Sequence, residues 1–361
     1  MEKLVVAIVV AFLLPLFLTP LVKKLAFKVG AIDAPNKRKV HYRIMPRLGG
    51  LAIYAAFIAA VLVFAPLTKP ILGLLAGATL IMLLGVVDDI KGLSPRIKLL
   101  GQIGAALVVV SFGVDVVYIT NPFQGMMDSG VFSFAGISLG LLSIPFTVFW
   151  IIGITNAVNL IDGLDGLAAG MAIIAAVTLA VIAWTEGHMA VVYLSLILAG
   201  ATLGFLKYNF HPAKIFMGDS GSMFLGFTLA TLAIMGLGKS ATIISLLIPI
   251  LILGVPIFDT AFAIVRRYLN AKPIFQADKE HLHHRLLALG LSHKQTVLVI
   301  YGLNFVLAAS AVLLTQLTTA QGMMILTMLS VAGILGAERL GIVGTKISLP
   351  QDEETFHQSG K

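Results

Sequence analysis

Long apolar runs, separated by short polar stretches, fill most of this chain. Each run has about the 20 residues that an α-helix needs to cross the hydrocarbon core of a bilayer. The first run lacks a small-residue cleavage site, so we expect an uncleaved span rather than a signal peptide. The pattern predicts an all-α polytopic membrane protein with about eleven spans, at 4–22, 48–66, 71–88, 97–112, 142–160, 166–184, 189–206, 220–237, 241–265, 295–315 and 321–338.

Composition agrees with this pattern. Hydrophobic residues make up 58% of the 361 residues and charged residues only 12%, whereas a soluble domain is roughly half apolar and a quarter charged. The chain has no cysteine, which excludes disulfides and thiolate sites. The net charge of +8 fits basic loops against an anionic leaflet and anionic substrates, so we expect no nucleic-acid partner.

The basic residues predict the orientation, because Lys and Arg concentrate in cytoplasmic loops. With the amino terminus outside, alternating spans leave only Lys3, Lys69 and Lys239 outside and place the carboxyl terminus in the cytoplasm. We therefore expect one transmembrane catalytic domain over residues 1–344 in the plasma (inner) membrane, with its site on cytoplasmic loops. Residues 345–361 should form a polar, flexible cytoplasmic tail.

Five cytoplasmic segments carry the candidate chemistry. The first, 33–50, is rich in Lys and Arg, which by itself indicates topology, and Gly49-Gly50 fits either close backbone approach or helix packing. The second is Asp88-Asp89 at the end of the third span. Neighbouring carboxylates repel, which raises one pKa unless a cation lies between them. The pair therefore suits a metal site or a general base, with a solvated helix end as the alternative.

The third segment, 156–166, has Asn and Asp pairs but no Lys or Arg. Its Asp-Gly pairs indicate either a break in the helix, at which side chains converge on a ligand, or plain turns between spans. The fourth, 209–221, places Asp219 at the expected start of the eighth helix. There Asp219 or Ser220 could cap the helix, or the helix end could attract phosphate.

The fifth segment, 266–295, contains the run His281-Leu282-His283-His284-Arg285. This run fits a metal cluster or an anion clamp, and we favour the clamp because adjacent histidines chelate one ion poorly from a helix. Carboxylate ligands without cysteine favour Mg²⁺, or Mn²⁺, over zinc. The sequence has no Gly-rich Walker loop, which argues against ATP-driven work.

Together these motifs resemble the polyprenyl-phosphate N-acetylhexosamine-1-phosphate transferase family (glycosyltransferase 4) over nearly the whole chain. The resemblance rests on Asp88-Asp89, the Asn-x-x-Asn-Leu-x-Asp-Gly-x-Asp-Gly run from Asn156, the Pro-Ala-Lys-x-Phe-Met-Gly-Asp-x-Gly run from Pro212, and the His-x-His-His-Arg run. The last run is similar to the WecA/TagO-type branch, which uses UDP-GlcNAc. The MraY-type branch takes UDP-MurNAc-pentapeptide and carries three consecutive histidines, a run that Arg285 breaks.

The resemblance implies transfer of GlcNAc-1-phosphate from UDP-GlcNAc to undecaprenyl phosphate, giving undecaprenyl-diphospho-GlcNAc and UMP, as a first membrane step toward teichoic acid, O-antigen or a similar envelope polymer. It implies catalysis by Asp88 with support from Asp89, and Mg²⁺ binding by Asp219 with Asn209. The implied nucleotide-binding residues are Asn159, Asp162, Gly163, Leu164, Asp165, Phe216 and Lys39. The implied phosphate- or sugar-binding residues are Lys98, His41, His281, His283, His284 and Arg285. Direct attack is favoured over a covalent aspartyl intermediate, since a lipid phosphate is already an anionic nucleophile.

Pro249, Gly254 and Pro256 predict a bend or break in the ninth span, which we expect to open a groove for the prenyl chain. Asp259 fits either this cavity or a polar helix contact. A lipid or solute transporter is the rival class, but its site would lie near the midplane, often on repeated halves. A non-catalytic lipid-binding protein would not need metal-type carboxylates. Small residues on apolar faces permit a homodimer.

Overall fold

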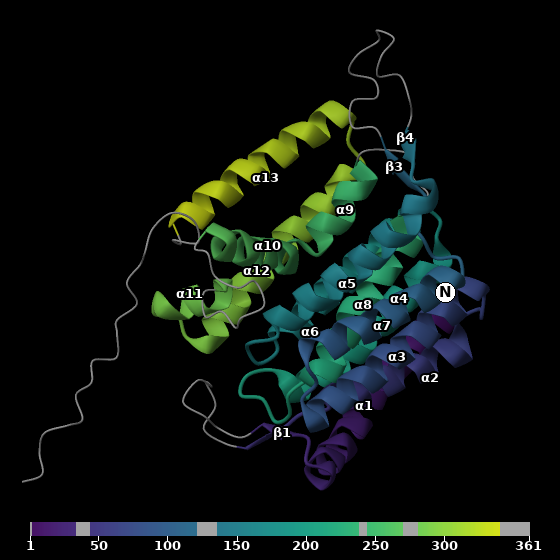
Figure 1. The fold of residues 1–361 in the computed structure, drawn as a ribbon, viewed down its shortest axis with the longest axis vertical. Helices are drawn as coiled ribbons and strands as arrows, with labels where there is room; N and C mark the ends of the chain where they lie inside the picture. Colours follow the sequence, from purple (N-terminus) through teal and green to yellow (C-terminus); the bar gives the residue numbers. More distant parts are fainter. Residues whose placement is uncertain (1, 34–43, 121–135, 238–243, 270–280, 340–361) are drawn as a thin grey trace, which may run out of the picture.

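The computed structural model describes residues 2–33, 44–120, 136–237, 244–269 and 281–339. Most of them are helical, and most of the helices run alongside one another in a bundle (Figure 1). Apart from the short α11, each helix below covers one predicted span. The helices are α1 (Glu2–Val29), α2 (Gly49–Phe64), α3 (Lys69–Lys91), α4 (Pro95–Ser111), α5 (Ser143–Ile161), α6 (Leu167–Thr185), α7 (Met189–Asn209), α8 (Gly218–Leu237), α11 (Leu282–Ala288), α12 (His293–Leu314) and α13 (Thr319–Arg339).

Several helices are long and apolar enough to cross a membrane. Within the described residues six qualify, namely α1, α3, α5 with the 3₁₀ turn before it, α6, α7 and α12. α2 and the Gln321–Gly336 part of α13 are shorter apolar helices. The polytopic character predicted from the sequence is confirmed, while the count of eleven spans and the orientation stay predictions.

Two short β-ladders correct the all-α expectation. β1 (Ile32–Asp33) pairs antiparallel with β2 (Met45–Pro46), and β3 (Tyr118–Thr120) pairs antiparallel with β4 (Gly136–Ser138). In register, Ile32 lies opposite Pro46 and Ile119 lies opposite Ile137. β1 lies at one end of the bundle and the β3–β4 hairpin at the other (Figure 1). Strands of two or three residues are too short to show an alternating pattern in the sequence.

The ninth predicted span is broken, as its prolines indicated. It consists of α9 (Ile244–Ile252) and α10 (Gly254–Leu269), with a turn at Leu253. Pro256 has no N–H, so it cannot donate the helical hydrogen bond to the carbonyl four residues earlier. The helical bonds continue around this gap, since the Leu253 amide donates to Pro249 and the Ile257 amide donates to Leu253, both at 3.1 Å. As a result α10 turns away from the direction of α9 (Figure 1).

Glycines at the start of α2 let the backbone approach the start of α8. A Cβ added to Gly50 would lie 2.1 Å from the Cα of Gly221. The amide of Gly49 donates to the carbonyl of Phe216 at 3.0 Å, and the amide of Gly50 donates to that of Met217 at 2.9 Å. Of the two interpretations left open by the sequence, close backbone approach is therefore the correct one. This contact fixes where α8 begins.

Candidate active site

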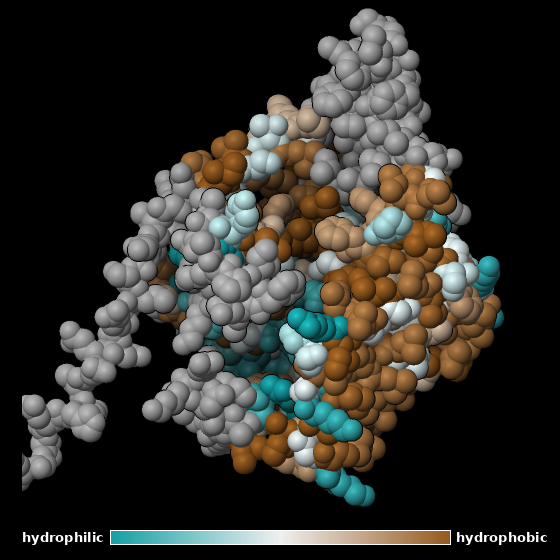
Figure 2. Space-filling view, viewed as in Figure 1, coloured by the Kyte–Doolittle hydropathy of each residue, from teal (hydrophilic) through white to brown (hydrophobic). Residues whose placement is uncertain are grey.

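Polar side chains gather at the end of the bundle that carries β1 and α11. Figure 2 shows hydrophilic residues around a hollow at this end, and apolar side chains lining a recess between α13 and the rest of the bundle. The described parts of all five motif segments meet here. A polar surface and an apolar surface thus lie close together at this end of the bundle.

Lys98 lies between two carboxylates from different helices. Its Nζ contacts Asp88 Oδ2 of α3 and lies 2.5 Å from Asp219 Oδ2 in the first turn of α8. Asp88 Oδ1 also accepts from the amide of Leu93 at 2.6 Å, and Asp219 Oδ1 accepts from Asn159 Nδ2 at 3.2 Å. The ammonium group of Lys98 thus lies where a divalent cation would contact two carboxylates. This oxygen-only donor set fits Mg²⁺ or Mn²⁺.

Asp89, next to Asp88 in sequence, has a different partner. Its carboxylate accepts from the amides of Asp219 at 2.9 Å and Ser220 at 3.1 Å, and from the Ser220 hydroxyl at 2.7 Å. Because α8 begins at Gly218, Asp219 and Ser220 lie inside its first turn and neither caps the helix, which removes one of the two alternatives left open by the sequence. Asp89 supplies the cap from α3 and thereby fixes the position of Asp219.

The turn between α5 and α6 lies beside this carboxylate pair. Burial, together with the negative charges of neighbouring aspartates, raises the pKa of Asp162 to about 8, while the charge of Arg47 opposes this rise. Arg47 also forms an ion pair with Asp33 Oδ1 at 3.0 Å. The described end of the first motif segment therefore faces the site through Arg47.

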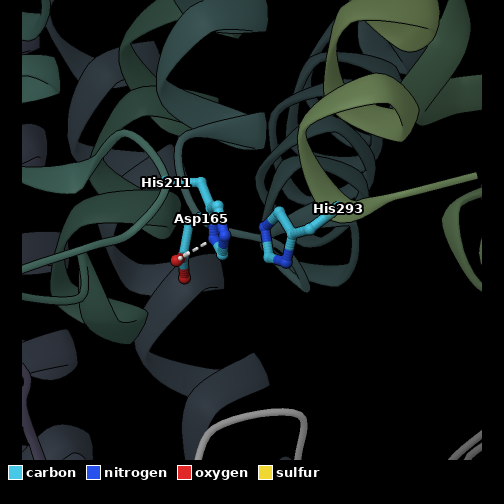
Figure 3. Close-up of side chains that lie close together, drawn as sticks. All are labelled: Asp165, His211 and His293. Atoms are coloured by element: carbon cyan, nitrogen blue, oxygen red, sulfur yellow. Dashed lines mark hydrogen bonds and ion pairs between the residues drawn. The ribbon is translucent and has the colours of Figure 1, made fainter.

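Asp165, His211 and His293 form a second polar cluster (Figure 3). Asp165 Oδ2 lies 2.9 Å from His211 Nδ1 and accepts from the amide of Ala213 at 3.0 Å. The ligand atoms of the three side chains lie within 4.8 Å of one another, a nitrogen-rich set that suits a transition metal better than Mg²⁺. However, the two imidazole rings stack 4.1 Å apart with 21° between their planes. Nearly parallel rings do not direct their in-plane lone pairs at one ion, so this cluster joins three segments instead.

The His-x-His-His-Arg run starts α11, with His281 as its N-cap residue. The rings of His281 and His283 are buried and parallel to 2°, with centroids 5.9 Å apart. A Cβ added to Gly163 would lie 2.5 Å from His283 Nε2, so α11 packs directly on the turn after α5. Burial, together with the neighbouring His284, lowers the pKa of His283 to about 3. His283 can therefore serve the predicted clamp only as a neutral hydrogen-bonding group.

Three other residues that were predicted to bind ligands are partly or fully buried within the protein. Asn209 Oδ1 accepts from the amide of Gly166 at 3.2 Å, and its Nδ2 donates to the carbonyl of Ile215 at 3.1 Å. A metal role for Asn209 would require Oδ1 to leave this bond. Leu164 is buried in an apolar cluster, while Phe216 is half-buried. Lys39 and His41 lie outside the described residues.

Sequence reasoning missed two polar residues of this region and left the role of a third open. His293 and Gln102 were not singled out, and Asp259 was left open. Gln102 is buried in α4 and its side-chain oxygen accepts from Asn156 Nδ2 at 2.7 Å. Each of the three lies within an apolar span or at its end, which is the signal that could have identified them, because polar side chains in such places mark functional or structural contacts.

Comparisons with known proteins show the family to which the chain belongs. The model of the family described as "Glycosyl transferase family 4" matches residues 71–237. The chain is 48% identical over 347 residues to the "Probable undecaprenyl-phosphate N-acetylglucosaminyl 1-phosphate transferase" of Bacillus subtilis (strain 168), covering 96% of this chain and 94% of the relative. It is 39% identical to the "Decaprenyl-phosphate N-acetylglucosaminephosphotransferase" of Mycobacterium tuberculosis (strain ATCC 25618 / H37Rv), covering 87% and 84%. It is 33% identical to the "Phospho-N-acetylmuramoyl-pentapeptide-transferase" of Thermoanaerobacter sp. (strain X514), covering 79% and 91%.

Proposed function

Since this chain belongs to glycosyl transferase family 4, we propose that it transfers GlcNAc-1-phosphate from UDP-GlcNAc to undecaprenyl phosphate and releases UMP. The observation that carries the proposal is the placement of Lys98 between Asp88 and Asp219 at one end of an apolar bundle. The relative that is 48% identical over 96% of the chain has a name that describes this transfer. The product is a membrane-bound precursor of a cell-envelope polymer.

The carboxylates and Lys98 suit phosphoryl transfer, which needs positioning and charge neutralisation more than covalent chemistry from the protein. Asp88 and Asp219 would hold Mg²⁺, or Mn²⁺, which when bound stabilises the charge of the diphosphate. An oxygen of the acceptor phosphate attacks the β-phosphorus, the bond from that phosphorus to the bridging oxygen breaks, and UMP leaves with the electron pair. Both oxygens of Asp88 are engaged, by Lys98 and by the amide of Leu93. This arrangement supports direct attack over an aspartyl intermediate.

The turn after α5 and the start of α11 are the proposed donor site. Because Gly163 contacts His283, a nucleotide held by the turn would lie beside the histidine run. Phosphate and sugar oxygens would be bound by His281, His283, His284, Arg285 and Lys98. The nucleoside would be bound by Asn159, Asp162, Gly163, Leu164, Asp165 and Phe216.

The apolar residues at the α9–α10 break are the proposed contact surface for the isoprenoid chain, and they line a small cavity. Residues of α5, α6, α8 and α12 complete the cavity wall around the break. Its lining includes Val158, Ile161, Met171, Leu229, Ile252, Leu253 and Pro256. The apolar recess in Figure 2 offers the chain a surface outside this cavity. We propose that the carboxylate end faces the cytoplasm at the plasma membrane, because that orientation leaves few basic residues outside, and a homodimer stays a prediction.

The test is UMP release by purified protein in detergent, with UDP-GlcNAc and undecaprenyl phosphate, with and without Mg²⁺. We expect release that requires both the lipid and the ion, and that is lost in Asp219→Ala. Asp115→Asn is the matched control, because Asp115 binds the Ser143 hydroxyl at 2.5 Å close to the β3–β4 hairpin, away from the site.

Two results would redirect the proposal. Release only from UDP-MurNAc-pentapeptide would assign the chain to the reaction named for the Thermoanaerobacter relative. No release with any UDP-sugar, from protein that stays monodisperse, would refute the transferase and favour a lipid or solute transporter.

A further inference from the structure

We propose that Asp259 of α10 is a positioning residue that sets the place of the His-x-His-His-Arg helix and the tautomer of His281. This inference rests on the proposed function, because it concerns how the donor site of that reaction is held. Asp259 lies outside the five motif segments, and no role in the reaction has been given to it above.

The contacts of Asp259 tie two separate elements together. Its Oδ2 lies 2.8 Å from His281 Nδ1, and its Oδ1 accepts from the amide of Leu282 at 2.8 Å. The two side chains are 8% and 7% exposed, so the pair is shielded from water. One carboxylate on α10 therefore binds both the ring of His281 and the first amide of α11.

The amide contact explains how so short a helix is held. α11 has only 7 residues, and its N-cap residue His281 makes no side-chain capping hydrogen bond. A helix start leaves amides without partners, and a carboxylate is a favourable one for them. Asp259 supplies this partner from another helix, so the start of α11 is anchored to α10.

The contact between Asp259 and the His281 ring determines which ring nitrogen carries the proton. An ionised carboxylate accepts hydrogen bonds and cannot donate them, so Nδ1 of His281 must donate to Asp259. Neutral His281 then carries its proton on Nδ1 and leaves Nε2 as an acceptor. A carboxylate that orients an imidazole in this way determines which nitrogen is available for other contacts.

α11 contacts the proposed nucleotide site through His283, so the position of α11 affects that site. The rings of His281 and His283 lie parallel, and His283 lies against Gly163. α10 also begins just after the break at Leu253, a residue that lines the apolar cavity. Asp259 thus joins the element beside the proposed acceptor chain to the element beside the proposed donor.

Asp259→Asn is the informative substitution, because it keeps the size of the side chain. Asparagine can still accept from the Leu282 amide with its oxygen, but it then presents an NH₂ group to His281 Nδ1 and requires the other tautomer. Asp259→Ala removes both contacts. Asp115→Asn is again the control, since its carboxylate also binds a single side chain, Ser143.

We expect Asp259→Asn to keep the thermal midpoint of the unaltered protein while kcat/KM for UDP-GlcNAc falls by about 10–100-fold, by analogy with carboxylates that orient metal-binding histidines. KM for undecaprenyl phosphate should not change, and Asp115→Asn should match the unaltered protein. A double variant, Asp259→Asn with His281→Gln, should be no slower than the slower single variant, since the two residues act as one unit.

Hydrogen exchange measured by mass spectrometry gives a readout that does not need turnover. The amides of α11 should exchange faster in Asp259→Ala than in Asp259→Asn, and faster in both than in the unaltered protein. Unchanged exchange in α11 would overturn the inference, whether or not the protein is a transferase. Equal kcat/KM in Asp259→Asn and Asp115→Asn would also overturn it. If the unaltered protein released no UMP, the proposed function would fail instead, and the exchange data would still decide whether Asp259 positions α11.

Discussion

Replacing Asp89 by alanine should destabilise the protein and remove activity by displacing Asp219. The substitution leaves three donors of the first turn of α8 without an acceptor, namely the amides of Asp219 and Ser220 and the Ser220 hydroxyl. A buried donor without a partner costs about 1–3 kcal/mol. Taking the lower value for each donor gives a loss of about 3 kcal/mol. Among the described residues, Asp115→Ala frees one donor, the Ser143 hydroxyl, so its loss should be about 1 kcal/mol.

The assay compares thermal unfolding of the two variants in one detergent, followed by the emission of the 2 tryptophans. Only differences between variants are used, because unfolding of membrane proteins is often irreversible. Asp219→Asn provides the contrast: it should lose UMP release while unfolding near the midpoint of the unaltered protein, because its contacts are with Lys98 and Asn159. If Asp89→Ala lost activity but unfolded no earlier than Asp115→Ala, Asp89 would act on the substrates directly and the capping argument would be refuted.

Three further outcomes follow from close contacts and burial. Gly50→Ala should give little monodisperse protein on size exclusion, because its Cβ would lie 2.1 Å from the Gly221 backbone, whereas Gly104→Ala, with no heavy atom within 4 Å of the new Cβ, should behave normally. Gly163→Ala should raise KM for UDP-GlcNAc, since the new methyl group would lie 2.5 Å from His283 Nε2; a KM equal to that of Gly104→Ala would contradict this. His283 has a pKa of about 3 against an ordinary value of 6.5, so the unfolded chain binds more protons between these values and stability should fall as pH drops from about 6.5 toward 3. His283→Gln should reduce this acid sensitivity of the thermal midpoint, and an unchanged pH profile would show that the ring is not buried neutral.

The spans and the break were predictable because their causes are local. Apolar runs of membrane length gave the positions of the long helices, and Pro256 broke the ninth span because it has no amide hydrogen. The two short ladders could not be predicted, since β1 and β2 have two residues each. Gly49-Gly50 indicated that another part of the chain could approach closely, but only the fold shows that this part is the start of α8.

The site was predictable as a set of residues more than as a set of roles. The motifs placed Asp88, Lys98 and Asp219 in one region, and the structure brings them into contact. The contact of Asp89 with the start of α8 could not be predicted, because adjacent aspartates look alike and the partner of Asp89 lies 130 residues away. His293 was missed for a similar reason, since its stacking partner His211 comes from a distant loop.

Lys98 also affects how the newly inserted chain folds. A cluster of carboxylates without a counter-ion would repel itself in a newly inserted chain, and such a chain would depend on a supply of metal to reach its native state. Here the ammonium group of Lys98 holds Asp88 and Asp219 together from within. If the site binds Mg²⁺ as proposed, the bundle can therefore fold before the ion binds, and the ion can enter the site together with the diphosphate of the donor.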